Sequence, residues 1–304
     1  MRLWPPILVF AMSKIPSIGR FAPSPSGRLH FGSLVSALGS YLRARSLNGK
    51  ILLRIEDLDF YRCKDEYTKA IIKELKVLGF EYDNDPYIQS KHQDIYREYA
   101  QKLLDKRDAY YCKCTREDLK HSPCKCKFLH LVPNDKQAMS LRYEVDTSIT
   151  SFEDSLLGTV ISAPLVDNFT LIRKDKVIAY NLACVVDDAL EGVTEVVRGS
   201  DLIDITTSQI SLYRSFNFAK AKYLHLPLAM ENSEFKLSKQ NKAKAILDIA
   251  PPSVLLKEAL EFLGQETSFF TPSMTPSQIL DKAISNFNLK AIPTMPKLCP
   301  SLFL

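Results

Sequence analysis

Four cysteines gather in one short window of the chain, as two C-x-C pairs separated by nine residues: Cys112, Cys114, Cys124 and Cys126. Four thiolates at this spacing can surround one tetrahedral Zn²⁺ ion. Such a site would be structural, because four protein ligands leave no open position for a catalytic water. His121 and His130 compete for the fourth position. The alternative is four reduced surface thiols without metal, which would be prone to oxidation.

A second group of residues that can do chemistry lies near the N-terminus, where His30, Gly32 and Ser33 end a loop rich in proline and glycine. From Leu34 to Leu42, apolar residues recur at helical spacing, so the loop precedes a helix. Backbone N–H groups and the helix dipole favour phosphate there, and Gly32 has no side chain to keep a flat ring away. The loop therefore indicates a nucleotide site. For HFGS alone, an ordinary proline-stiffened connection with a surface histidine is the better interpretation.

Charged side chains follow two predicted strands. Glu56 comes directly after the apolar strand 51–55, and Arg198 ends the strand VTEVV. Ligands bind at the carboxyl ends of parallel strands, so Glu56 could hold an ammonium group and Arg198 a carboxylate. A solvated acidic turn is the alternative for Glu56, and Tyr180 either adds a hydroxyl to the same pocket or merely packs. The alternative for Arg198 is an ion pair with one of three aspartates: Asp187, Asp188 or Asp201.

A polar loop after the predicted strand 224–230 contains Lys236 and Lys239 in the string FKLSK. Such a loop can fold over a triphosphate and neutralise the charge that grows on departing pyrophosphate. KLSK is also a common string on protein surfaces. If it stood alone, an ordinary surface loop would be the preferred interpretation.

The elements that must position these residues follow from hydrophobic periodicity. A strand at 18–21, the proline-rich loop, a helix to about residue 47 and the strand 51–55 form one parallel crossover. Amphipathic helices are predicted at 65–79 and after Ser90.

Residues 139–173 alternate between apolar and polar residues, as strands do. The chain then returns to the sheet with a buried strand or helix start at Leu182–Val186. A helix is predicted from about Leu202 and another at Val254–Leu263, followed by an irregular tail.

A chain of 304 residues can bury a large core and is expected to form one main domain with an insertion or appendage. Its net charge of +5 permits a nucleic-acid partner without requiring one. No apolar run is long enough to span a bilayer, and there is no convincing secretion signal, so a cytoplasmic protein is expected. Residues 1–16 are expected to be a disordered extension, which a translation start at Met12 would shorten; a signal peptide is the alternative.

Taken together, RFAPSPSGRLHFGS and FKLSK resemble the two signature sequences of class I aminoacyl-tRNA synthetases. LLRIEDLD, YNLACVVDDALEGVTEVVRGSDL and LHLPL are similar to the catalytic domain of the glutamyl-tRNA synthetases. The resemblance runs in order from Gly19 to Ala245. Five motifs in sequence with sensible spacing are far more specific than any one of them.

The chain departs from that pattern in two ways. The first signature usually ends in histidine, where this chain has Ser33. After KLSKQ the sequence has no room for the long helical anticodon-binding region. With the cysteine cluster, these departures resemble the glutamyl-Q tRNA(Asp) synthetases, paralogues that activate glutamate without tRNA and attach it to queuosine in the anticodon loop of tRNA(Asp). Three rival functions stay open: a truncated glutamyl-tRNA synthetase charging the 3′ end of tRNA, a related nucleotidylyltransferase, and a catalytically silent zinc-containing RNA-binding protein.

The resemblance implies a role for each matching residue. Expected glutamate contacts come from six residues: Arg20, Ala22, Ser24, Glu56, Tyr180 and Arg198. Expected contacts to ATP, which binds with Mg²⁺, come from seven: Pro23, His30, Gly32, Ser33, Lys236, Ser238 and Lys239. His30 and Lys239 would be the catalytic residues. One structural zinc would bind the four cysteines, and the second C-x-C pair matches the family pattern less securely than the first.

The implied fold is α/β, a Rossmann-like parallel sheet with an inserted zinc-containing α+β subdomain and a short helical C-terminal appendage. The expected boundaries are 1–16 for the extension, 17–110 and 176–245 for the two halves of the catalytic domain, 111–175 for the insertion and 246–304 for the helical region. The expected partners are glutamate, ATP and tRNA(Asp) carrying queuosine, with no membrane, and the expected state is a monomer.

Overall fold

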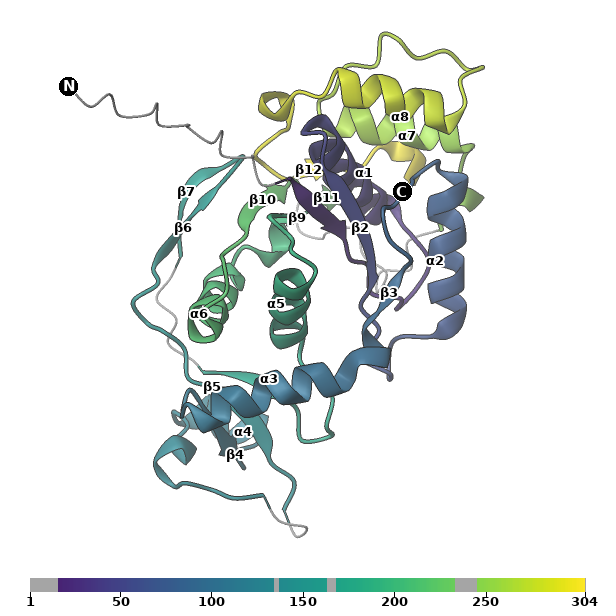
Figure 1. Ribbon diagram of the computed structural model, residues 1–304. Coiled ribbons are helices and arrows are strands. Elements are labelled where there is room, and N and C mark those ends of the chain that lie inside the picture. Colours follow the sequence, from purple (N-terminus) through teal and green to yellow (C-terminus); the bar gives the residue numbers. More distant parts are fainter. Residues whose placement is uncertain (1–15, 134–136, 163–167, 233–244, 304) are drawn as a thin grey trace, which may run out of the picture.

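The computed structural model describes residues 16–133, 137–162, 168–232 and 245–303. Within these ranges, no helix has the length and apolar character needed to cross a membrane. Figure 1 shows a parallel sheet region flanked by helices, with a smaller β-containing unit at one end and a pair of C-terminal helices at the other. The expected fold class is confirmed.

The first half of the sheet contains the predicted crossover. β1 (Ile18–Phe21) and β2 (Lys50–Ile55) are parallel neighbours, and α1 (Phe31–Ser46) connects them. The apolar face of α1 is buried, as its periodicity predicts. The short β3 (Tyr87–Ile88) extends this sheet beyond β2, after α2 (Asp65–Val77).

The second half pairs β9 (Glu195–Gly199) with β10 (Lys222–Leu226) in parallel, with α5 (Tyr180–Leu190) before them and α6 (Thr206–Phe216) between them. The ambiguous apolar run Leu182–Val186 is therefore helical. The backbone N–H of Thr194, just before β9, donates to the carbonyl of Ile18 at 2.8 Å and so joins the two halves.

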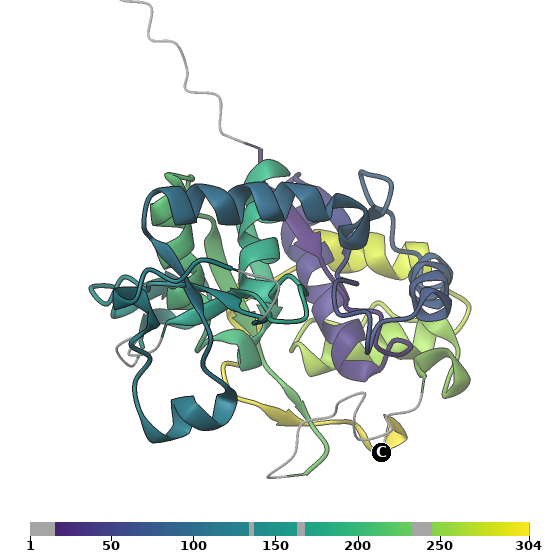
Figure 2. The same ribbon diagram turned by 90° about the horizontal axis from the view of Figure 1, so that it is seen from below.

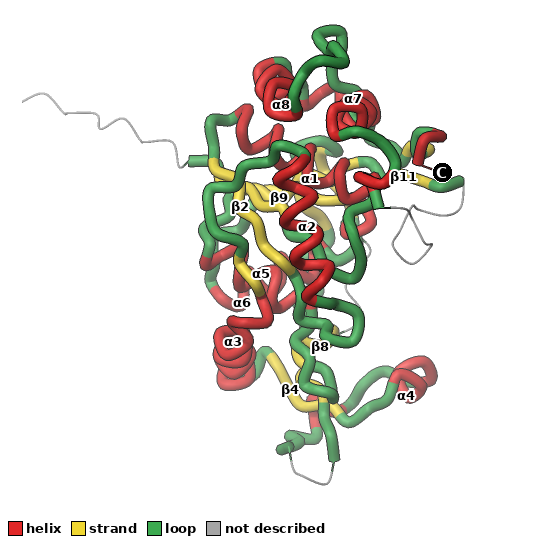
Figure 3. Tube along the Cα trace, turned by 90° about the vertical axis from the view of Figure 1, so that its right-hand side faces the viewer, coloured by secondary structure: helices red, strands yellow, loops and turns green. Residues whose placement is uncertain are grey.

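The smaller unit is built around α3 (Gln93–Asp105) and an antiparallel sheet of β4 (Ala109–Cys112), β5 (Ser140–Tyr143) and β8 (Phe169–Ile172). It also carries the short helix α4 (Arg116–His121). Figure 3 shows β4 and α4 at the end of the molecule opposite to the C-terminal helices.

Not all of the segment between 111 and 175 belongs to this unit. β6 (Ser151–Asp154) pairs with β10 in parallel, and β7 (Gly158–Ile161) pairs with β6. This hairpin therefore extends the main sheet. The domain boundaries expected from the sequence, 111 and 175 among them, stay a prediction.

The C-terminal region packs on α1. α7 (Pro252–Phe262) places Phe262 edge-on against Phe31, with ring centroids 5.4 Å apart. α8 (Pro276–Ser285) follows, so the irregular tail predicted from the sequence is wrong there. β12 (Lys297–Leu298) then pairs with β11 (Ala229–Met230), a short strand that follows β10 in the chain. Figure 2 shows β11 and β12 side by side.

Candidate functional site

A pocket of about 760 Å³ opens at the carboxyl ends of the strands of both sheet halves. Ten residues singled out from the sequence line it: Arg20, Ala22, Pro23, Ser24, His30, Gly32, Ser33, Glu56, Tyr180 and Arg198. The other three, Lys236, Ser238 and Lys239, lie outside the described residues. The fold thus brings together residues far apart in sequence, and their individual roles stay predictions.

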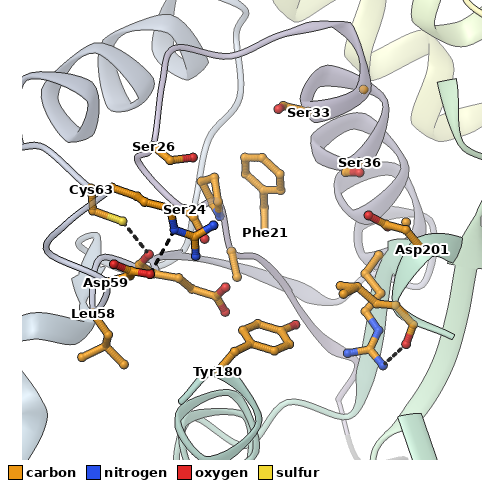
Figure 4. Close-up of a pocket in the computed structure, with 18 of the residues that line it drawn as sticks. Phe21, Ser24, Ser26, Ser33, Ser36, Leu58, Asp59, Cys63, Tyr180 and Asp201 are labelled. Atoms are coloured by element: carbon orange, nitrogen blue, oxygen red, sulfur yellow. Dashed lines mark hydrogen bonds and ion pairs between the residues drawn. The ribbon is translucent and has the colours of Figure 1, made fainter. Parts of the chain in front are cut away.

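One side of the pocket is the N-terminus of α1. His30 is the extended residue before the helix, with φ −116° and ψ 173°, and its carbonyl accepts the backbone N–H of Leu34 at 3.0 Å. Figure 4 shows Ser33 and Ser36 on α1, with Asp201 across from Ser36. The first backbone N–H groups of α1 lack partners within the helix, so this side suits phosphate groups.

Glu56 lines the pocket and comes directly after β2. Its backbone N–H donates to the carbonyl of Pro23 at 3.0 Å, and only 9% of the residue is exposed, so it is not part of a solvated turn. Its Oε1 is buried and has no hydrogen-bond partner among the described residues. Burial raises the pKa of Glu56 to about 7, although Arg54 and Arg20 act in the opposite direction. This carboxyl group suits a ligand that brings its own positive charge.

Arg20 reaches the pocket from β1 and is held from behind. Its Nε donates to Asp188 at 3.1 Å, and its Nη1 donates to the carbonyl of Val197 at 3.2 Å. Arg54 donates to the same Asp188 oxygen at 2.7 Å and also pairs with Glu191. Burial alone would raise the pKa of Asp188, but the two arginines lower it. Arg54, and the pairing of Asp188 with Arg20 and Arg54, were not predicted from the sequence. The available signal was the acidic pair Asp187 and Asp188 within an apolar helix.

Arg198 stands at the end of β9, on the pocket wall. Its Nη1 donates to Gln209 Oε1 at 2.7 Å, and its Nη2 donates to Thr206 Oγ1 at 2.7 Å and to the carbonyl of Leu202 at 3.3 Å. These partners are uncharged. Asp187 and Asp188 pair with Arg54 instead, so the alternative that either neutralises Arg198 is wrong.

Tyr180 is the first residue of α5, and its side chain projects into the pocket (Figure 4). At the opposite side of the pocket from Asp201, the same view shows Leu58, Asp59 and Cys63. Two arginines from separate segments share Asp59: Arg62 at 3.0 Å and Arg173 at 3.6 Å. Both arginines line the pocket, and Arg173 also pairs with Asp175 at 2.8 Å, so Asp59 and Asp175 offset the two positive charges.

The cysteine cluster is a separate site in the smaller unit. The four Sγ atoms all lie within 4.8 Å of one another. Cys112 and Cys114 lie 3.5 Å from Cys124 and Cys126, respectively. Sulfurs bound tetrahedrally at ~2.3 Å from zinc would be about 3.8 Å apart, so this arrangement fits the ion. His121 is exposed and lies 3.0 Å from Glu117, so it is not part of the cluster.

The chain matches one known protein family along most of its length. The family model for tRNA synthetases class I (E and Q), catalytic domain, matches residues 18–250. The glutamyl-Q tRNA(Asp) synthetase of Escherichia coli (strain K12) is 43% identical, over 95% of this chain and 95% of its own length. That of Shewanella oneidensis is 43% identical, over 91% of this chain and 93% of its own length.

A similar fold occurs in a glutamate tRNA ligase from Elizabethkingia meningosepticum, solved in complex with its amino acid. The TM-score is 0.78 at 22% sequence identity, and the match covers 94% of this chain and 68% of that one. At this identity the likeness supports the fold alone.

Proposed function

The chain belongs to the glutamyl-Q tRNA(Asp) synthetase family within the class I synthetases for E and Q, and we propose that it performs that family's two-step reaction. In the first step it activates glutamate with ATP in the absence of tRNA. In the second step it transfers glutamate to the queuosine base in the anticodon loop of tRNA(Asp).

The observation that carries this proposal is the composition of one pocket. Two groups face the same cavity as the N-terminus of α1. One is a buried Glu56 oxygen that has no hydrogen-bond partner among the residues the structure describes, and the other is the Arg198 guanidinium, which uncharged groups hold. The ammonium and carboxylate groups of an amino acid complement the first two, and the phosphates of ATP complement the third. A pocket of about 760 Å³ is of the size that holds such ligands.

Activation is an in-line displacement. The α-carboxylate of glutamate attacks the α-phosphorus of ATP, which binds with Mg²⁺, and pyrophosphate leaves, giving glutamyl-adenylate. Little covalent work falls to the protein, which orients the reactants and stabilises developing charge. His30 and the backbone N–H groups of α1 would act on the phosphates, and Lys239 on the departing pyrophosphate. Glu56 and Tyr180 would hold the ammonium group.

Transfer needs an RNA loop at the mouth of the pocket. A hydroxyl of the queuosine cyclopentenediol attacks the mixed anhydride, forms the ester and releases AMP. Arg62 and Arg173, which line the pocket, would donate hydrogen bonds to the phosphates of that loop. The net charge of +5 favours the same encounter.

The cysteine cluster would hold one structural Zn²⁺, which would fix the loop between β4 and β5. Reduced cysteines in that number suit a cytoplasmic protein, which is where we place it. The expectation of a monomer stays a prediction.

The acceptor is tested by transfer of labelled glutamate to three purified RNAs: tRNA(Asp) with queuosine, tRNA(Asp) without it, and tRNA(Glu). Label on the first alone is the expected result. Label on the 3′ end of tRNA(Glu) would instead identify a truncated glutamyl-tRNA synthetase. Activation without transfer to any of the three would contradict the proposed second step.

A further inference from the structure

Two buried side chains that the proposed reaction does not use lie behind Arg198. They are Asp154, the last residue of β6, and His225, the last but one of β10. Both side chains are 0% exposed. β6 and β10 are adjacent strands, with Asp154 paired to Tyr223, so the sheet itself sets the distance between the two groups.

The contacts define a chain of three side chains. His225 Nδ1 lies 2.8 Å from Asp154 Oδ2, and His225 Nε2 lies 3.1 Å from Arg198 Nε. An arginine can only donate, so Nε2 must accept, and Nδ1 must carry the proton that it donates to Asp154. Burial lowers the pKa of His225, which keeps the ring neutral and able to fill both roles.

Asp154 is held so that it can serve only as an acceptor. Its Oδ1 accepts the backbone N–H groups of Leu156 and Leu157, both at 2.9 Å. Its Oδ2 accepts the backbone N–H of His225 at 3.0 Å in addition to the ring. Burial alone would raise the pKa of Asp154, but these hydrogen bonds lower it, so the carboxylate stays charged.

The result is an arginine with nearly all of its donors assigned. Arg198 has five N–H donors. In the part of the chain that the structure describes, four of them donate to known acceptors: His225, Gln209, Thr206 and the carbonyl of Leu202. The remaining donor is on Nη1, and Arg198 lines the pocket. The guanidinium therefore has one defined orientation and one N–H left for a ligand.

We propose that Asp154 and His225 are positioning residues, which fix the guanidinium of Arg198 for a carboxylate of the amino-acid substrate. Asp154 sets the tautomer of His225, and His225 stops the guanidinium from rotating about its stem. The inference rests on the proposed function, because that function supplies the carboxylate.

The test measures KM for glutamate and KM for ATP separately, by glutamate-dependent ATP–pyrophosphate exchange. His225→Leu removes the acceptor, and Asp154→Asn favours the wrong tautomer. Each is expected to raise KM for glutamate about 10- to 100-fold while leaving KM for ATP unchanged, the range for losing a hydrogen bond to a charged group. His225→Gln, whose Oε1 can replace Nε2, should restore most of the affinity. His121→Leu, at an exposed histidine, is the matched control.

A merely structural role predicts a different pattern. If His225→Leu and Asp154→Asn alter both KM values alike, and His225→Gln restores nothing, the inference is overturned.

In an Arg198→Ala background, His225→Leu should have little further effect on KM for glutamate, and additive losses would contradict the chain of contacts. Wild-type protein without glutamate-dependent exchange would overturn the proposed function and this inference together. Normal wild-type exchange with an unchanged His225→Leu variant would overturn this inference alone.

Discussion

Two buried groups of opposite charge face the same pocket, and neither is fully compensated by its neighbours. Glu56 Oε1 has no hydrogen-bond partner among the described residues, and the groups that accept from Arg198 are uncharged. Burying charge without compensation is costly, so such groups persist where a ligand completes them. A zwitterion supplies both missing charges at once.

Glu56 makes glutamate binding dependent on pH. Because its pKa in the ligand-free protein is about 7, it must lose a proton before it can hold an ammonium group. KM for glutamate should therefore fall as pH rises toward 7, by up to about tenfold per pH unit, and level off above it. Glu56→Gln should raise KM and flatten this profile. An unchanged profile in that variant would show that another group titrates.

The same shift has a consequence for stability. A carboxyl group whose pKa is raised by folding favours the folded state below its ordinary value of 4.5, and this contribution is lost as pH rises through about 7. Glu56→Gln should therefore raise the free energy of unfolding of the ligand-free protein at pH 8, but not at pH 4. Urea unfolding at the two pH values measures the difference.

Lys239 and Arg198 should affect different kinetic constants. Lys239→Ala removes charge stabilisation that operates in the transition state, so kcat for exchange should fall about 100-fold or more while glutamate binding is nearly intact. Arg198→Ala should chiefly raise KM for glutamate. Steady-state exchange kinetics of both variants separate the two roles, and a normal kcat for Lys239→Ala would exclude it from catalysis.

For single residues, the sequence predicts those that line the pocket better than those that contact them from behind. Glu56 and Arg198 could be found because each follows an apolar strand within a motif. His225 and Asp154 could not, because their contact spans 71 residues and depends on the register of β6 against β10. Such partners have no spacing pattern in the sequence.

The elements show where periodicity is sufficient and where it is not. α1 and α2 have long apolar faces and were predictable. The run Leu182–Val186 was ambiguous because five apolar residues fit a strand or a buried helix equally. α8 was missed although its N-terminus has a clear signal, since Thr275 and Gln278 form a capping box around Pro276.

The turn after α7 depends on a glycine. Gly264 has φ +67°, and a Cβ there would lie 2.2 Å from the backbone oxygen of Ala291. Gly264→Ala should lower the free energy of unfolding by about 2–5 kcal/mol, through strain and overlap together. Gly158→Ala is the control, because it has φ +74° but open space, and should cost only about 1–2 kcal/mol. Equal losses in urea unfolding would show that the overlap relaxes.

The smaller unit should be stabilised by the zinc ion proposed for the four cysteines. One zinc per chain is expected by elemental analysis, and Cys126→Ser should reduce this content and lower Tm by roughly 5 °C or more. His121→Ala should keep the zinc, because His121 lies outside the cluster. Full zinc content in Cys126→Ser would contradict the four-cysteine site.

At the scale of the whole molecule, the order of motifs predicted the fold class, and the structure confirms it. Parallel crossovers leave few ways to arrange strands that carry these motifs, so the pocket lies at the carboxyl ends of the strands. The association of the β6–β7 hairpin with the main sheet could not be predicted, because a hairpin's own pattern does not specify which neighbour covers its edge.

The proposed function requires that this pocket activates glutamate in the absence of tRNA. ATP–pyrophosphate exchange on purified protein, with glutamate, glutamine or aspartate and without tRNA, tests it most directly. Exchange with glutamate alone is the expected result. Exchange that begins only after tRNA(Glu) is added, or no exchange under any condition, would contradict it.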